Sequence, residues 1–597
     1  MSRFAHRVAR ASISAVLVAS LVGCGLTPVP LEDSGGNSET TQTEPEPIID
    51  DTPVALPEPD DTGSGRMDAD VESVEVEDLS YYVGETGGSY ATNPYYYYQP
   101  DPSSTEEYSS LEETGYVVTA STPLSTVSAD VDTASYANLR RMLKEGYSTS
   151  TSAKKELTDD DAEQLELYPD YYADYYDVIP TGAVRIEEML NYFNYDYDLP
   201  KGDDGFAITA RMGDCPWNKD TKLLVLGFAT AKEDESVSQK GSNLVFLIDV
   251  SGSMDSVDKL ELLKDSFGEL IKTLDENDRV SIVTYSGQEE VVVDGAKGDD
   301  RDALWKAINE LKADGSTNGE AGLRMAYEVA EKNYIEGGVN RIVMASDGDL
   351  NVGMTSESDL HDFVAQKRET GIYLSVLGFG TGNYKDNKME TLADNGNGSY
   401  HYIDCVEEAE CVFGERLTAN LVPFANDVKV QVEFNPAEVK AYRLIGYENR
   451  TMAAEDFTDD TKDAGEVGPE SQFTVAYEIV TADSKMEIET PELKYGQKAE
   501  GDADATSREW LTAKLRYKAL DGGDAKEQEL VVDEKDLQDD PGDDWRFAAA
   551  VTEFGMILRD SDYKGTSTYD EVRELVGDTK DEARMGFLDL VEMAQNN

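Results

Sequence analysis

Histidine and cysteine are scarce in this chain of 597 residues, and their scarcity excludes several kinds of site. The three histidines are His6, His361 and His401. They leave almost no material for a histidine-based catalytic triad or a multi-histidine zinc centre. The four cysteines are Cys24, Cys215, Cys405 and Cys411. Because no two of them form a C-x-x-C pair, a zinc ribbon and a thioredoxin-type motif are excluded.

Basic residues are also few, with 52 Lys and Arg against 122 Asp and Glu and a formal net charge of −70. A nucleic-acid-binding surface needs clustered Lys and Arg to neutralise phosphates. We therefore exclude nucleic acid as a partner. So acidic a surface repels its own copies and attracts cations.

The signatures of common enzyme classes are missing as well. The sequence contains no G-x-S-x-G elbow, no H-E-x-x-H motif and no P-loop. Pairs of carboxylates are frequent only because acidic residues are frequent. We therefore predict that the protein is not an enzyme.

The N-terminus has the pattern of an export signal. Arg3, Arg7 and Arg10 precede the apolar run 11–22, which is too short to remain as a spanning helix. The run ends in the sequence Leu-Val-Gly-Cys at Cys24 and resembles a lipobox; the alternative is an ordinary signal peptide with a chance cysteine. We expect residues 1–23 to be a lipoprotein signal peptide. Lipidation at Cys24 would anchor the mature chain to the extracytoplasmic face of the cell membrane.

Residues 24–115 are predicted to be an acidic, disordered tether. From residue 25 onward this segment holds 22 acidic residues, and its one basic residue is Arg66. A segment this polar cannot bury enough apolar surface to offset its ordering entropy. Repulsion between like charges extends it further.

A small α+β region is expected at 116–235. A strand predicted over 127–132 places Asp130 and Asp132 on one face, and a helix follows over 133–144. The two aspartates are candidates for calcium binding. The interpretation we favour is a solvated strand face, with Asp132 or Thr133 capping the helix. Tyrosines at helical spacing in 154–177 predict a packed stripe, and further elements are expected at 183–192 and 206–212.

Residues 242–422 alternate between strands and helices, which predicts a doubly wound α/β domain with a parallel sheet. Strands are expected at 244–250, 279–285, 341–345 and 373–378. Helices are expected at 259–274, 302–311, 319–334, 358–370 and 407–421. In such sheets, ligands bind at the carboxyl ends of the strands.

Three loops at that edge carry oxygen-bearing side chains. The first strand ends at Asp249, followed by Ser251 and Ser253, while Thr317 precedes a helix and Asp347 follows another apolar strand. Oxygen donors in an octahedral array select Mg²⁺ or Mn²⁺ over Zn²⁺. Neutral hydroxyls leave much of the ion's charge uncompensated, so a carboxylate from a partner protein is the expected sixth ligand.

This constellation resembles the metal-ion-dependent adhesion site of von Willebrand factor type A domains. The resemblance implies that Ser251, Ser253 and Thr317 bind the metal directly. It also implies that Asp249 and Asp347 act mainly through water. A lone D-x-S-x-S motif is weak, whereas all five elements in this order within an α/β pattern are specific.

Segments outside the α/β domain resemble a family of bacterial lipoproteins with a central type A domain. They include STVSADVDTASY at 125–136, AVRIEEMLNYF at 183–193 and FAAAVTEFGMILRDS at 547–561. The C-terminal region 425–597 is expected to be β-rich and sandwich-like in its first part, and then helical. Its strands are expected at 428–434, 472–479 and 510–517, and its helices at 544–559 and 571–593.

Two readings of function stay open. In the first, the protein is a membrane-anchored binding module that captures a partner through the metal. In the second, it is a structural or assembly component of the envelope that holds a neighbouring subunit.

The cysteines Cys405 and Cys411 are six positions apart in a predicted helix, which separates them by roughly 9 Å along its axis. This exceeds the Cα separation of about 4.4–6.8 Å that a disulfide spans. We therefore expect no bridge between them.

Overall fold

The computed structural model describes residues 106–597 except for 158–161, 163–176, 203, 233–239, 349–356, 489–507, 521–522, 534 and 536–539. The predicted signal peptide, Cys24, most of the predicted tether and most of the tyrosine-rich stripe lie outside the described residues. Among the helices that the structure describes, none is long and apolar enough to cross a membrane.

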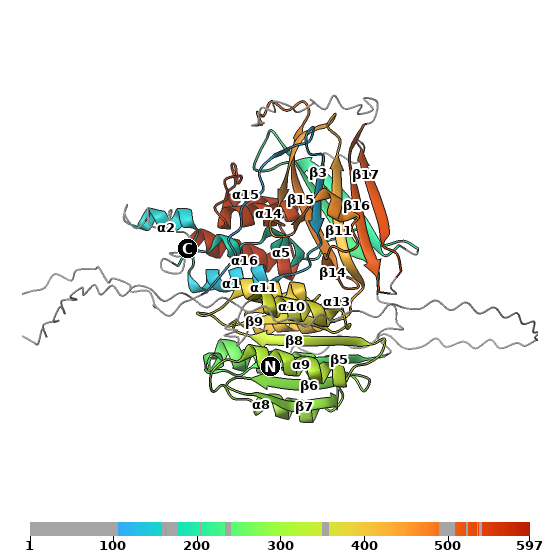
Figure 1. The fold of residues 1–597 in the computed structure, drawn as a ribbon. Coiled ribbons are helices and arrows are strands. Elements are labelled where there is room, and N and C mark those ends of the chain that lie inside the picture. Colours follow the sequence, from blue (N-terminus) through green and yellow to red (C-terminus); the bar gives the residue numbers. More distant parts are fainter. Residues whose placement is uncertain are drawn as a thin grey trace, which may run out of the picture. The chain divides into compact units, whose positions relative to one another are not determined.

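A six-stranded sheet forms the centre of the domain predicted at 242–422. Its strands are β5 Ser242–Asp249, β6 Arg279–Tyr285, β7 Glu289–Lys297, β8 Val339–Ser346, β9 Tyr373–Phe379 and β10 Tyr400–Ile403. Their order is β10-β9-β8-β5-β6-β7, of which Figure 1 labels all but β10, and all neighbours are parallel except β6 and β7. The predicted α/β fold is therefore confirmed, with an antiparallel strand added at one edge.

Helices cover both faces of this sheet. One face packs against α7 Leu262–Thr273, α8 Arg301–Asn309 and α12 Val406–Glu410. The other packs against α9 Gly319–Lys332, α10 Glu357–Arg368 and α11 Asp386–Asn395. Within β5, Leu244 and Phe246 face the first group, whereas Val245 and Leu247 face the second. Because both faces are buried, the strand is a continuous apolar run.

Some elements of this domain differ from expectation. The sequence did not predict β7, α11 or β10; β7 is an edge strand with exposed and half-buried positions, and β10 has four residues. The helix expected at 407–421 is interrupted. It consists of α12, a π-helical turn at Cys411–Glu415 and α13 Leu417–Leu421. Gly414 lies in that turn, where its low helix propensity favours the break.

A β-sandwich combines strands from before and after the central domain. One sheet has the order β1-β12-β15-β4-β3 and the other β13-β2-β11-β16-β17, with β14 paired to β11. The strands are β1 Val117–Val118, β2 Leu124–Ser128, β3 Phe206–Asp214, β4 Lys222–Thr230, β11 Ala425–Phe434, β12 Val439–Ile445, β13 Thr451–Met452, β14 Gly465–Val467, β15 Gln472–Thr481, β16 Glu509–Ala519 and β17 Lys526–Asp533. Buried side chains of both sheets share one core. The sequences flanking the central domain thus build one structural unit.

Helices complete this flanking unit. They are α1 Ala134–Glu145, α2 Ser150–Glu156, α5 Ile186–Asn191, α14 Asp543–Leu558, α15 Tyr569–Val576 and α16 Glu582–Asn596. The single helix expected at 571–593 is in fact two. Gly577 follows α15 with φ +63°, a positive value that glycine adopts freely and that a right-handed helix cannot include.

The three described cysteines form no disulfide. Cys215 is buried, and Cys405 and Cys411 are half-buried. Cys405 is the N-cap residue of α12 and Cys411 opens the π-helical turn. The expectation that Cys405 and Cys411 remain unbridged is confirmed.

Candidate metal-binding site

The first predicted loop follows β5, whose last residue is Asp249. Asp249 and Ser251 are buried, and the Ser251 N–H donates to Asp249 Oδ1 at 2.8 Å. Asp249 Oδ2 accepts a hydrogen bond from Ser346 Oγ at 3.1 Å. The Oγ atoms of Ser251 and Ser253 lie 2.9 Å apart. The Asp249 carboxylate, held by these two hydrogen bonds, therefore lies beside a pair of hydroxyl oxygens at the carboxyl end of the sheet.

The second loop lies against the first. The Gly252 N–H donates to Gly315 O at 3.0 Å. Asn318 caps α9, with its side-chain oxygen accepting from the Ala321 N–H at 3.5 Å. Thr317 lies between these two fixed points and is half-buried. No described hydrogen bond joins its side chain to the first loop. The position of Thr317 is set by the Gly252–Gly315 backbone contact before it and the Asn318 cap after it.

The third loop carries an unexpected ion pair. Asp347, directly after β8, is 0% exposed. Lys259 Nζ lies 3.0 Å from Asp347 Oδ2 and donates to Asn383 Oδ1 at 2.8 Å. Asn383 Nδ2 also donates to Asp347 Oδ2, at 3.3 Å. An ammonium group of the protein therefore contacts one of the carboxylates that we predict to face the metal.

The donor set fits Mg²⁺ or Mn²⁺. With metal–oxygen distances of about 2.0–2.1 Å, adjacent corners of an octahedron lie about 2.9 Å apart. The hydroxyls of Ser251 and Ser253 have this spacing. Within the described ranges, no cluster of three or more Asp, Glu, His or Cys side chains is arranged to hold a metal. Binding here would therefore depend on hydroxyls as much as on carboxylates.

The protonation of Asp249 is sensitive to its surroundings. Burial raises the pKa of Asp249 to about 6; hydrogen bonding to Ser251 lowers it and the negative charge of Asp347 raises it. A bound divalent cation would oppose the effect of burial, because it favours the ionised carboxylate.

Residues 106–108, which we name the strap, support the third loop. Glu106, with a side chain 1% exposed, accepts the Gly382 N–H at 2.9 Å and pairs with Arg141 of α1 at 2.9 Å. The Glu107 N–H donates to Tyr384 O at 2.9 Å. The strap therefore links α1 to the loop that presents Asn383. Composition places 106–115 in the disordered tether, but Glu106 is packed against the folded chain, so the prediction is wrong for this residue.

Sequence reasoning missed Lys259, Asn383 and Glu106. Lys259 had a local signal, since the helix predicted at 259–274, directly after the first metal loop, begins at this residue. Asn383 and Glu106 had none, because each reaches the site only through long-range packing. The rule that ligands bind at the carboxyl ends of the strands identified the three loops. It did not identify the residues that hold those loops in place.

The expectation for Asp130 and Asp132 is wrong. Strand β2 ends at Ser128, so neither residue lies on a strand face, and both are buried. Asp130 Oδ1 accepts the Asp132 N–H at 2.9 Å, and Asp132 Oδ1 accepts the Tyr400 N–H at 2.8 Å. Thr133, the N-cap residue of α1, makes no side-chain capping bond. These carboxylates belong to the junction between the central domain and the flanking unit.

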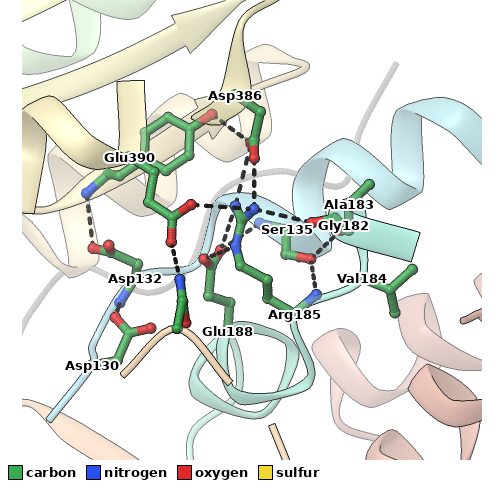
Figure 2. A network of polar contacts seen from close by, with 12 residues as sticks. Asp130, Asp132, Ser135, Gly182, Ala183, Val184, Arg185, Glu188, Asp386 and Glu390 are labelled. Carbon is green, nitrogen blue, oxygen red and sulfur yellow. Dashed lines mark hydrogen bonds and ion pairs between the residues drawn. The ribbon is translucent and has the colours of Figure 1, made fainter. Parts of the chain in front are cut away.

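Arg185 lies at the centre of that junction (Figure 2). Its guanidinium contacts Glu188, lies 2.6 Å from Asp386 and 3.6 Å from Glu390. Asp386 and Glu390 belong to α11 of the central domain, whereas Arg185 and Glu188 belong to the flanking unit. Burial raises the pKa of Glu188 and of Glu390 despite the guanidinium beside them. This network of buried charged side chains connects the central domain to the flanking unit.

Comparison with known proteins supports the architecture. A family model for the von Willebrand factor type A domain matches residues 243–410, and one described as von Willebrand factor matches 102–156 and 173–225. A model of the C-terminal region of uncharacterized protein YfbK matches 419–596. The chain is 36% identical over 504 residues to uncharacterized protein YfbK of Escherichia coli K12, covering 82% of this chain and 81% of that one. The chain belongs to the YfbK family.

Membership of the YfbK family confirms a central type A domain within family-specific flanks. Type A domains generally mediate protein–protein interaction or adhesion, often with a metal ion. Mouse inter alpha-trypsin inhibitor heavy chain 4 is 27% identical over 192 residues, covering 31% of this chain and 19% of that one. Among solved structures, the von Willebrand factor type A protein of Catenulispora acidiphila is 15% identical with TM-score 0.34, covering 68% of this chain and 89% of that one.

Proposed function

We propose that this YfbK-family protein is a membrane-anchored, extracytoplasmic binding protein that captures a protein partner through Mg²⁺ or Mn²⁺. Ser251, Ser253 and Thr317 would hold the ion directly, with Asp249 and Asp347 behind them. The observation that carries the proposal is the pair of Ser251 and Ser253 hydroxyls, hydrogen-bonded at 2.9 Å, beside a buried carboxylate. The bound ion would supply an electrophilic position that accepts a carboxylate of the partner.

The protein's own residues would set how strongly that position attracts an anion. The proposed direct ligands are neutral hydroxyls, so they cancel little of the ion's charge. Lys259 adds a positive charge next to Asp347. A site of this composition favours an acidic group on the partner over a neutral one.

Replacing Ser253 by alanine should abolish stabilisation by metal while the fold persists, because Ser253 is exposed and its loss leaves β5 intact. A ligand at a hundredfold excess over its Kd stabilises the folded state by about 2.7 kcal/mol. The full chain should therefore melt higher in millimolar Mg²⁺ than in EDTA, and Ser253→Ala should not.

The matched control is Ser316→Ala, which removes an exposed hydroxyl from the neighbouring loop. It should keep the metal-dependent shift in melting temperature. If the melting temperatures of the wild type and Ser253→Ala shift equally, the metal acts only by diffuse screening of the acidic surface. That result would reject the specific site.

Capture of the partner is tested by a crosslinking pull-down with and without EDTA, with Ser253→Ala as control. Metal-dependent capture of a component of the producing cell's own envelope would favour an assembly role. Capture confined to foreign ligands would favour adhesion. Capture that ignores both EDTA and the substitution would contradict a metal-bridged contact.

Anchoring is proposed to depend on a lipidated Cys24, as its lipobox-like context indicates. Cys24→Ala should be released as soluble protein, because one substitution removes all the acyl chains. Intact-mass analysis of the wild-type N-terminal peptide should show acyl mass. Retention of Cys24→Ala in the membrane fraction would count against the anchor.

A further inference from the structure

Lys259 places a buried positive charge beside the candidate metal site. Its side chain is 7% exposed, and it lies in the π-helical turn Val257–Glu261 that leads into α7. Its Nζ atom lies 3.0 Å from Asp347 Oδ2 and donates to Asn383 Oδ1 at 2.8 Å. Lysine is almost never buried this deeply unless it is paired, so these two contacts hold the ammonium group in place.

The backbone after β9 leaves room for the Lys259 side chain. Gly380 directly follows β9 and has φ +73°. A Cβ atom on Gly380 would overlap the Cγ, Cδ and Cε atoms of Lys259. The aliphatic part of the lysine therefore occupies space that any other residue at position 380 would fill. This close packing directs the charged end of the side chain to Asp347.

Lys259 changes the electrostatic balance of the candidate site. The five predicted site residues bring two carboxylates, those of Asp249 and Asp347, and three neutral hydroxyls. The ammonium group of Lys259 offsets one of the two negative charges. Around a divalent cation, these side chains would then leave one positive charge uncompensated. Without Lys259, the two carboxylates would balance the charge of the ion.

We propose that Lys259 weakens the binding of the metal ion and strengthens the capture of the partner's carboxylate. This inference rests on the proposed function, because it requires a site that holds Mg²⁺ or Mn²⁺. The ammonium group repels the cation and attracts the anion, so one charge acts on the two affinities in opposite directions. A purely structural ion pair would behave differently. Breaking it would disturb the loop that carries Asp347 and weaken both affinities.

The first measurement is the affinity of the full chain for Mn²⁺, followed by electron paramagnetic resonance of the free ion. Binding that persists in Ser253→Ala is subtracted as background from the acidic surface. Lys259→Met keeps the length of the side chain and removes its charge, so it should bind Mn²⁺ at least about tenfold more tightly than the wild type.

The matched control for Lys259→Met is Lys272→Met. Lys272 is an exposed lysine near the end of α7. At about 1.5 Å per residue it lies roughly 20 Å from Lys259 along the helical run. This distance exceeds the Debye length of about 8 Å at physiological ionic strength. Lys272→Met should therefore leave the affinity for Mn²⁺ unchanged.

The second measurement uses acetate as the probe for the partner's carboxylate. Broadening of the acetate methyl resonance by bound Mn²⁺ reports the affinity of acetate for the metal-loaded protein. Lys259→Met should bind acetate at least about tenfold more weakly than the wild type, and Lys272→Met should match the wild type. Acetamide, a neutral molecule of the same shape, should show no difference between Lys259→Met and the wild type.

A second variant tests the inference with Lys259 in place. Asn383→Asp puts a negative charge against the ammonium group, so it should also tighten Mn²⁺ binding and weaken acetate binding. If both variants weaken both affinities, Lys259 is only a structural support, and if they change neither affinity, its charge has no influence. Either result would overturn the inference. Equal binding of Mn²⁺ by the wild type and Ser253→Ala would reject the metal site itself, and this inference with it.

Discussion

Replacing Arg185 by methionine is expected to destabilise the protein by about 3–5 kcal/mol, the usual cost of removing one partner from a buried ion pair. Arg185 is almost fully buried between Glu188, Asp386 and Glu390. Its loss leaves three buried carboxylates without their main cation. Because Asp386 and Glu390 lie on α11, the loss should also loosen the junction between the central domain and the flanking unit.

Urea unfolding of the wild type and Arg185→Met at pH 7 measures this cost. The control is Arg324→Gln, which breaks a partly exposed pair with Glu320 on α9 and should cost less than about 1 kcal/mol. A cost for Arg185→Met no larger than that of the control would contradict the role assigned to the network.

The free energy of unfolding is expected to fall as the pH rises from 5.5 to 8.5. Burial raises the pKa of Glu187, Glu188 and Glu390, and raises that of Glu553 to about 8. In the unfolded chain these groups titrate near about 4.3. Above that value the folded state holds protons that the unfolded state has released. Stability is therefore full below the unfolded pKa and is lost as the pH rises through the folded pKa.

Each such group contributes up to about 1.4 kcal/mol per pH unit within its window, so several together give a steep profile. Urea midpoints at pH 5.5, 7.0 and 8.5 provide the measurement. Glu553→Gln, which removes one titrating group from α14, should flatten the profile. A midpoint that stays constant or rises with pH would refute the assignment of protonated buried carboxylates.

Sequence predicted the central domain because its signals are local. The apolar run of β5, the loop residues from Asp249 to Ser253 and the helix starting at Gly319 each need only a short window of chain. The strand β7 and the division between α15 and α16 escaped detection. The first is only partly buried, and the second depends on the backbone conformation of Gly577.

The junction was beyond sequence reasoning for a different reason. Asp130 and Asp132 look like solvated residues, because aspartates before a helix usually are. Their burial depends on Arg450, which lies within 4.0 Å of both and is more than 300 positions away. A buried carboxylate is specified by its distant partners, and in a chain with 122 acidic residues the local sequence does not mark which of them are buried.

The strap has a mechanical consequence. Glu106 and Glu107 are the first residues that the structure describes, so tension applied from the N-terminal side reaches them before any described β-strand. Besides their ion pairs with Arg141 and Lys385, they are held to the loop at 382–384 by two hydrogen bonds, one from the Gly382 N–H to the Glu106 carboxylate and one from the Glu107 N–H to the Tyr384 carbonyl. These are far fewer than join the strands of the sheets. Under a pull the strap would detach first and release the loop that places Asn383 against Asp347. We therefore expect tension from the N-terminal side to disturb the geometry of the candidate metal site.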